Sequence, residues 1–84
     1  MIDPKPGDEG RWVTYVPRVG DREVGIIQRW NKDFVFVNYH SGDTGAGTLR
    51  SDLEWGLVGN VRNRITGHWE IYNTPKDDPA EKDM

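Results

Sequence analysis

The hydrophobic residues of this chain occur in short alternating runs separated by glycines, prolines and polar turns. Ten glycines and five prolines divide its 84 residues, and no segment repeats an apolar residue with the spacing of an amphipathic helix. Apolar and polar residues instead alternate in Arg11 to Val16, Glu23 to Trp30 and Phe34 to Tyr39. A period of two is typical of a β-strand. The sequence therefore predicts an all-β protein.

The residues between these runs predict where the strands end. Pro17 ends the first run because proline has no amide hydrogen to donate to a neighbouring strand. Asn31-Lys32-Asp33 separates the second run from the third with residues that tolerate turn geometry, so we expect a β-hairpin there. Residues 40–47, HSGDTGAG, form a glycine-rich segment typical of a loop.

The elements beyond this loop are shorter. We expect a short strand at Thr48 to Arg50, a single helical turn at Ser51 to Leu53, and extended structure again from Glu54. Residues 56–72 carry β-branched and aromatic residues on either side of Arg62-Asn63-Arg64. That pattern predicts a further strand or a hairpin.

Three stretches of the chain resemble a known family. GRWVTYVP, REVGIIQRWNKDFVFVNY and GTLRSDLEW are similar to the small SH3-like, Tudor- or KOW-like, barrel proteins that are widespread in bacteriophages and prophages. The similarity covers about Gly7 to Trp55, and its most specific elements are FVFVNY and SDLEW. The resemblance implies a strongly bent five-stranded sheet, a phage or mobile-element origin and a binding role. It implies no particular activity.

We therefore expect a small five-stranded SH3-like barrel with a C-terminal extension. Residues 1–10 are an N-terminal arm, residues 11–55 the barrel, and residues 56–72 an additional strand or hairpin that covers it. Residues 73–84 contain no large apolar side chain except Met84. They cannot offset the entropy lost on ordering, so we expect a disordered acidic tail.

Alternation along the third run predicts which side chains face the core. If Val35, Val37 and Tyr39 point inward, Phe34 and Phe36 point outward, because successive side chains lie on opposite sides of a strand. Both sides then carry large apolar groups, although one face of a small barrel normally contacts water. Something must cover the second face.

Three candidates could provide this cover. In the first run, Val13 and Tyr15 share the inner side, and Trp12 lies on the other. The second face is then covered by the C-terminal segment with Trp69 and Ile71, by a second copy of the chain, or by a partner.

Composition and charge narrow the functional classes. The chain has no cysteine, which excludes disulfides and thiolate metal sites and favours the reducing cytoplasm, of a host cell if the origin is a phage. It contains no apolar run of signal-peptide length and none of the roughly 20 residues that a membrane span needs. The net charge is −3, but residues 11–72 hold eight Arg and Lys against seven Asp and Glu. The negative net charge argues against nonspecific binding of duplex nucleic acid, but the arginines of residues 11–72 could still form a local basic patch.

The candidates for catalysis are weak. Asp43-Thr44-Gly45-Ala46 matches the catalytic tetrad of retroviral-type aspartic proteases, but it does not follow an apolar strand as it does in those enzymes. His40 and His68 are the only histidines, and neither has a partner at metal-ligand spacing. We therefore expect no enzyme activity, no cofactor and no metal.

The aromatic residues and arginines predict a binding module. The candidate binding residues are Trp12, Arg29, Trp30, Phe36 and Arg50. Aromatic faces can hold a methylated cation, as in Tudor-like cages, for which Tyr15 and Tyr39 are further candidates. Aromatics beside arginines can instead stack nucleic-acid bases, as in KOW-like barrels.

We expect a protein partner first, in keeping with a phage protein that acts on a host factor. Nucleic-acid binding by the barrel is the alternative, and for it Arg62 and Arg64 are further candidates. A homodimer through a self-complementary sheet edge is also open.

Overall fold

The computed structural model describes residues 1–40 and 45–81 of the chain. These residues form a seven-stranded sheet and no long helix, so the predicted all-β fold is confirmed, with seven strands where the barrel prediction had five. The elements are β1 (Trp12–Tyr15), β2 (Arg22–Trp30), β3 (Phe34–Asn38), β4 (Ala46–Leu49), the 3₁₀ turn η1 (Arg50–Asp52), β5 (Leu53–Trp55), β6 (Leu57–Asn63), β7 (His68–Lys76) and the 3₁₀ turn η2 (Pro79–Glu81). The predicted helical turn is therefore present one residue earlier, as η1.

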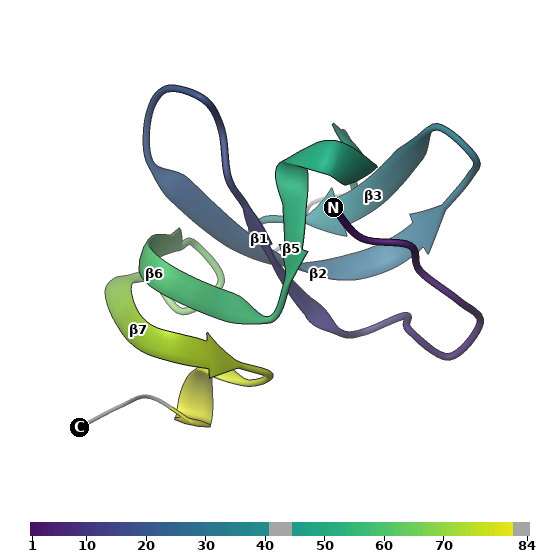
Figure 1. The fold of residues 1–84 in the computed structure, drawn as a ribbon. Helices are drawn as coiled ribbons and strands as arrows, with labels where there is room; N and C mark the ends of the chain where they lie inside the picture. The colour runs from purple at the N-terminus through teal and green to yellow at the C-terminus, as the bar shows by residue number, and fades with distance from the viewer. Residues whose placement is uncertain (41–44, 82–84) are drawn as a thin grey trace.

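Five strands follow one another across the sheet in the order β4-β3-β2-β1-β5, each antiparallel to its neighbours. β6 leaves this path and pairs in parallel with the beginning of β2, at Arg22 with Val61 and Glu23 with Arg62. β7 pairs antiparallel with β6. In Figure 1 the β6–β7 hairpin lies at the lower left, and the β2–β3 hairpin projects to the right.

β2 contacts three strands because it is long and bent. A register shift between Ile27 and Arg29 marks a bulge, which increases the local twist. Gly25 in β2 lies close to the end of β3, since a Cβ at this position would lie 2.6 Å from the carbonyl oxygen of Asn38. A residue without a side chain is therefore required there.

The turn between β2 and β3 is the one that the sequence predicted. Asn31 Oδ1 accepts hydrogen bonds from the backbone amides of Asp33 at 2.9 Å and Phe34 at 2.8 Å. The Asn31 amide donates to the Phe34 carbonyl at 2.9 Å, which closes the hairpin. An Asx turn of this kind holds the loop without glycine.

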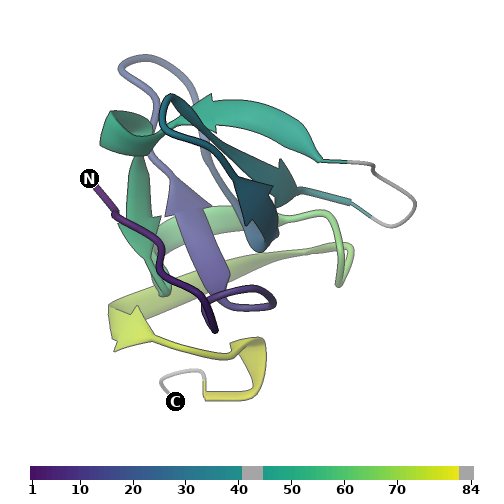
Figure 2. The ribbon, with the colours of Figure 1, turned by 90° about the vertical axis from the view of Figure 1, so that its right-hand side faces the viewer.

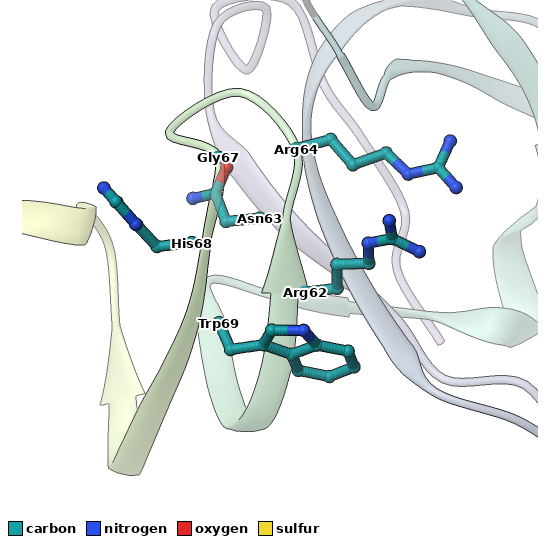
Figure 3. Close-up of a pocket in the computed structure, with 6 residues that line it drawn as sticks. All are labelled: Arg62, Asn63, Arg64, Gly67, His68 and Trp69. Carbon is teal, nitrogen blue, oxygen red and sulfur yellow. The ribbon is translucent and has the colours of Figure 1, made fainter.

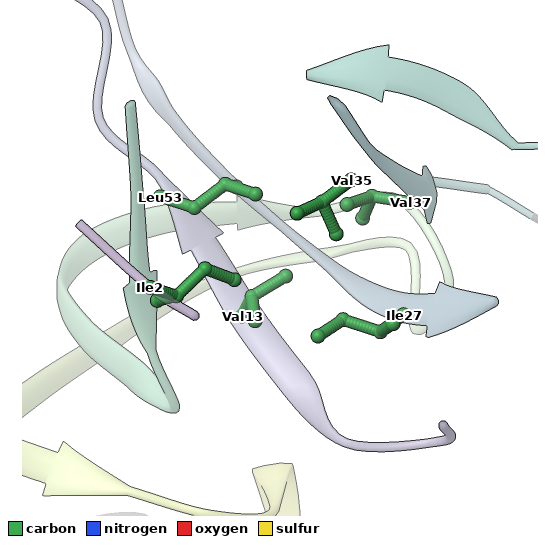
Figure 4. Packing of buried hydrophobic residues seen from close by; sticks show 6 residues of the cluster. All are labelled: Ile2, Val13, Ile27, Val35, Val37 and Leu53. Atoms are coloured by element: carbon green, nitrogen blue, oxygen red, sulfur yellow. The ribbon is translucent and has the colours of Figure 1, made fainter. Parts of the chain in front are cut away.

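The first core cluster lies inside the five-strand path. Its buried members are Ile2, Val13, Ile27, Val35, Val37 and Leu53, whose side chains converge in Figure 4. Val35 and Val37 are fully buried while Phe34 is 39% exposed, so the predicted alternation of the third strand is confirmed. Ile2 comes from the N-terminal arm, and its amide donates to the Arg50 carbonyl at 3.1 Å. The arm is therefore part of the packed fold.

The second core cluster lies on the other face of the sheet, under the β6–β7 hairpin. It consists of Val24, Leu57, Val61 and Tyr72, with Trp12 packed against it. The C-terminal segment thus covers the second face, as one of the three alternatives predicted. The residues that do so are not those predicted: Trp69 and Ile71 are 54% and 62% exposed, because Tyr72 takes the inward position.

A buried carboxylate supports this hairpin. Glu70 is only 3% exposed and accepts hydrogen bonds from Asn63 Nδ2 at 2.9 Å and from the Tyr72 hydroxyl at 3.0 Å. Burial, followed by the hydrogen bond to Glu70, raises the pKa of Tyr72 far above its usual value. The phenol therefore stays protonated and remains a donor.

Order continues beyond residue 72. β7 runs to Lys76, whose partner in β6 is Leu57, and the Tyr72 hydroxyl oxygen, which donates to Glu70, also lies 3.3 Å from the carbonyl oxygen of Pro79 in η2. The prediction of a disordered tail from residue 73 is therefore wrong for the strand residues 73–76. Pairing with β6 supplies the backbone hydrogen bonds that the composition of this segment alone did not reveal.

Candidate functional site

The predicted binding residues Arg29 and Phe36 lie together on the outward side of the β2–β3 hairpin. They are cross-strand partners, and the Arg29 guanidinium carbon lies 4.5 Å from the centroid of the Phe36 ring. A cation over an aromatic face stabilises both side chains. The two side chains contact each other, and together they cover the outer face of the β2–β3 hairpin.

The two predicted tryptophans lie on different faces. Trp30 packs against the first core cluster and, with Glu9, Gln28 and Arg29, lines a hollow of about 200 Å³. Trp12 packs against the second core cluster. Both are half-buried, and the sheet separates them, so they do not share one binding surface.

The fifth predicted residue, Arg50, holds the N-terminal arm. Its guanidinium donates to Asp3 Oδ1 at 2.7 Å and to the carbonyl of Asn31. A hydrogen bond from Lys5 and then the charge of Arg50 lower the pKa of Asp3. Arg50 thus joins the arm to the β2–β3 turn through its two terminal nitrogens, while its buried Nε has no hydrogen-bond partner among the described residues.

A pocket of about 410 Å³ lies beside β4 and was not predicted as a unit. We call it the β4-edge pocket, and it is lined by Tyr15, Glu23, Phe34, Tyr39, Ala46, Gly47, Thr48, Leu49 and Asp52. Its volume is in the range of small-ligand and side-chain sites. These residues come from β1, β2, β3, β4, η1 and the segment after β3, so only the folded sheet brings them together.

Two of the three aromatic residues that line the β4-edge pocket are tyrosines in contact with each other. The Tyr15 and Tyr39 rings lie edge to face, with centroids 6.3 Å apart and an angle of 67° between the ring planes. The Tyr39 hydroxyl is 2.8 Å from Thr48 Oγ1, which orients its ring against β4. Both rings are half-buried, so part of each lies open to the pocket.

Two carboxylates complete the pocket. Glu23 Oε1 lies 3.1 Å from Nε of Arg64, which reaches it from the turn after β6. Asp52 makes no ion pair or side-chain hydrogen bond within the described residues. Aromatic faces and carboxylates attract positive charge, so the chemistry of this pocket suits a cationic group.

The free edge of β4 runs along the pocket. Among the described residues β4 pairs with β3 alone, and Figure 2 shows it at the upper rim of the molecule. Its residues AGTL include no charge and no proline, the features that usually prevent a further strand from pairing. Phe34 and Leu49, which are partners across β3 and β4, are 39% and 49% exposed on its outer side.

The described residues contain few other candidates for chemistry. In residues 1–40 and 45–81, no three His, Asp or Glu side chains are grouped so as to hold a metal ion. Asp43 of the protease-like tetrad lies outside the described residues. None of the described residues forms a helix long and apolar enough to cross a membrane.

No family model, curated protein or solved structure matches this chain.

Proposed function

We propose that the protein is a phage-type SH3-like barrel with an added hairpin, and that it binds another protein without catalysing a reaction. The five-strand path, in which β5 returns to pair with β1, supports the barrel. The C-terminal hairpin β6–β7 is the extension. A chain without cysteine suits the cytoplasm of a host cell, where we propose that it acts.

The β4-edge pocket is the observation that carries this proposal. Its tyrosine pair and its two carboxylates suit the side chain of a lysine or an arginine in the partner. Asp52 supplies a carboxylate that no cation of the described chain neutralises. The ligand class is therefore a basic side chain carried by a protein segment.

The free edge of β4 indicates how that segment lies. An extended segment can pair its backbone with β4 and so continue the sheet. Its alternate side chains then point to opposite faces, and those directed into the β4-edge pocket meet a lining that includes the apolar Phe34 and Leu49 as well as the two tyrosines. We expect a partner sequence in which a basic residue stands between two apolar ones.

The geometry of the barrel favours this reading over nucleic-acid binding by the same surface. Arg50 is directed at Asp3 and Asn31, and Arg29 covers Phe36 on another part of the sheet. Two carboxylates line the β4-edge pocket itself and would repel phosphates.

Titration of the ¹⁵N-labelled protein with a capped peptide Thr-Val-Arg-Val-Thr tests the proposal. We expect amide shifts centred on β4, Tyr15 and Tyr39, and weaker binding by a peptide with glutamine in place of arginine. Asp52→Asn should weaken binding about two- to fivefold, the range of a partly exposed ion pair. Asp33→Asn, which removes an equal charge from the exposed β2–β3 turn, is the matched control.

Two results would contradict the proposal. One is equal binding of the arginine and glutamine peptides, because the pocket would then not recognise charge. The other is an equal loss in Asp52→Asn and Asp33→Asn, which would reflect net charge alone.

A further inference from the structure

The tip of the β6–β7 hairpin carries two arginines and an exposed tryptophan. Arg62 and Trp69 are direct partners across the two strands, so their Cβ atoms lie roughly 5 Å apart. Figure 3 shows Arg62, Arg64 and Trp69 on the same side of the hairpin, with His68 pointing to the other side. We call these three residues the hairpin-tip surface. They line a pocket of about 270 Å³ together with Asn63, Gly67 and His68.

Hydrogen bonds to Asn63 hold the turn between β6 and β7 that presents this surface. Asn63 Oδ1 accepts hydrogen bonds from the backbone amides of Ile65 at 3.0 Å and Thr66 at 3.1 Å. The amide of Gly67 donates to the Asn63 carbonyl at 2.8 Å, and Gly67 has a φ of +83° that favours glycine. Asn63 also donates a hydrogen bond to the buried Glu70. The backbone of the turn that carries the two arginines and the indole therefore has a fixed conformation.

The charge of this surface is opposite to that of the β4-edge pocket. None of the six lining residues is a carboxylate. Arg62 is exposed and makes no ion pair within the described residues, while Arg64 pairs with Glu23 through Nε at 3.1 Å and its side chain is 45% exposed. Guanidinium groups have five N–H donors, so the terminal nitrogens of Arg64 remain available to an anion.

We infer that the hairpin-tip surface binds single-stranded nucleic acid, with a base stacked on Trp69 and phosphates contacted by Arg62 and Arg64. The indole of Trp69 is 54% exposed and can take a base on its open area. A duplex has no free base face for such a contact. Two arginines on a protein of net charge −3 give weak electrostatic binding alone, so stacking must contribute.

A second copy of the chain fits this surface less well. In a two-fold symmetric contact the same patch faces itself, which would bring the arginines of both copies together. A single strand of nucleic acid instead brings negatively charged phosphates to Arg62 and Arg64. This inference concerns a different surface from the proposed protein site and does not rest on that proposal, although the ion pair between Arg64 and Glu23 joins the two sites.

Fluorescence anisotropy with labelled oligonucleotides of about eight nucleotides tests the inference. We expect oligo(dT) or oligo(U) to bind and a duplex of equal length to bind more weakly. The comparison of DNA with RNA shows which sugar is preferred. For two phosphate contacts, the logarithm of the binding constant should fall with the logarithm of the salt concentration with a slope of about −1.4.

Variants of the surface separate stacking from charge. Trp69→Ala should lower the affinity about 5- to 150-fold, and Trp69→Phe should retain most of it. Arg62→Ala should reduce the salt slope by about 0.7, whereas Arg62→Lys should keep it. Ile71→Ala, an exposed neighbour on the same strand face, is the control and should leave binding unchanged.

The ion pair between Arg64 and Glu23 gives a further matched comparison. Glu23→Gln and Asp52→Asn each remove one negative charge from the β4-edge pocket, but only Glu23 contacts Arg64. Glu23→Gln should therefore strengthen oligonucleotide binding more than Asp52→Asn does. Equal effects of the two variants would overturn the assigned role of Arg64.

Other results would overturn the inference as a whole. They are the absence of oligonucleotide binding by the full chain, equal binding to duplexes or to vesicles rich in phosphatidylserine, or an unchanged affinity in Trp69→Ala. Amide spectra of each variant show whether it is folded. Trp69→Phe and Arg62→Lys keep the test decisive if an alanine variant unfolds.

Discussion

Replacement of single residues along β7 tests which of its faces packs on the rest of the sheet. Tyr72 is 1% exposed and lies in the second core cluster, whereas Trp69 is 54% exposed on the other face of the strand. Removal of a buried aromatic side chain costs about 3–5 kcal/mol of unfolding free energy. The total for 84 residues is roughly 4–13 kcal/mol, so Tyr72→Ala should remove between about a quarter and all of the stability.

A second substitution separates the hydroxyl of Tyr72 from its ring. Tyr72→Phe keeps the ring but removes the hydrogen bond to Glu70 at 3.0 Å and the contact with the Pro79 carbonyl oxygen at 3.3 Å. The loss of a donor to a buried carboxylate costs about 1–3 kcal/mol. For a domain of this size, even the lower figure lowers Tm by about 4–8 °C.

The control for both variants is Trp69→Ala, because it removes a larger side chain from the exposed face. A surface substitution of this kind usually changes stability by no more than about 0.5 kcal/mol. Urea unfolding followed by far-ultraviolet circular dichroism measures all three variants without relying on the tryptophan signal. A loss above about 2 kcal/mol in Trp69→Ala, with little change in Tyr72→Ala, would show that β7 presents its opposite face to the second core cluster and would refute this reasoning.

Three further predictions concern the remainder of the fold. Gly56→Ala should destabilise the protein by more than about 1 kcal/mol in urea unfolding, because Gly56 has a φ of +74° and a Cβ there would lie 2.5 Å from the Lys76 carbonyl oxygen. Unchanged stability would contradict this backbone conformation. Thr14→Val should cost about 1–3 kcal/mol by the same assay, because the buried hydroxyl donates to the Gly56 carbonyl at 2.7 Å, and a neutral result would mean that this bond is absent. Asp3→Asn should flatten the acid end of the Tm profile: Lys5 and Arg50 lower the pKa of Asp3, so its contribution to stability is present above the unfolded value of 3.8 and is lost as the pH falls through the folded value. Identical profiles for Asp3→Asn and the parent protein between about pH 2 and 6 would argue against that contribution.

Local patterns in the sequence determined the strands and the tightest turn. Val35 and Val37 alternate with phenylalanines, and a strand places successive side chains on opposite faces whatever its neighbours are. Asn31 forms the hairpin turn with the amides that follow it directly. Such features depend on contacts between residues close in the chain, so they could be predicted without knowledge of the tertiary structure.

The tertiary structure alone decided the cover of the second face and the grouping of the residues of the β4-edge pocket. Trp69 and Ile71 are as apolar as Tyr72, so hydrophobicity did not show which face of β7 packs inward; pairing with β6 and the bond from Tyr72 to Glu70 decided it. Arg50 became a structural residue because folding brings Asp3 beside it, 47 positions away in the chain. The β4-edge pocket likewise combines residues from Tyr15 to Asp52, and the pairing of the strands that carry them depends on contacts that a one-dimensional pattern does not contain. The hairpin-tip surface, in contrast, lies within the single β6–β7 hairpin.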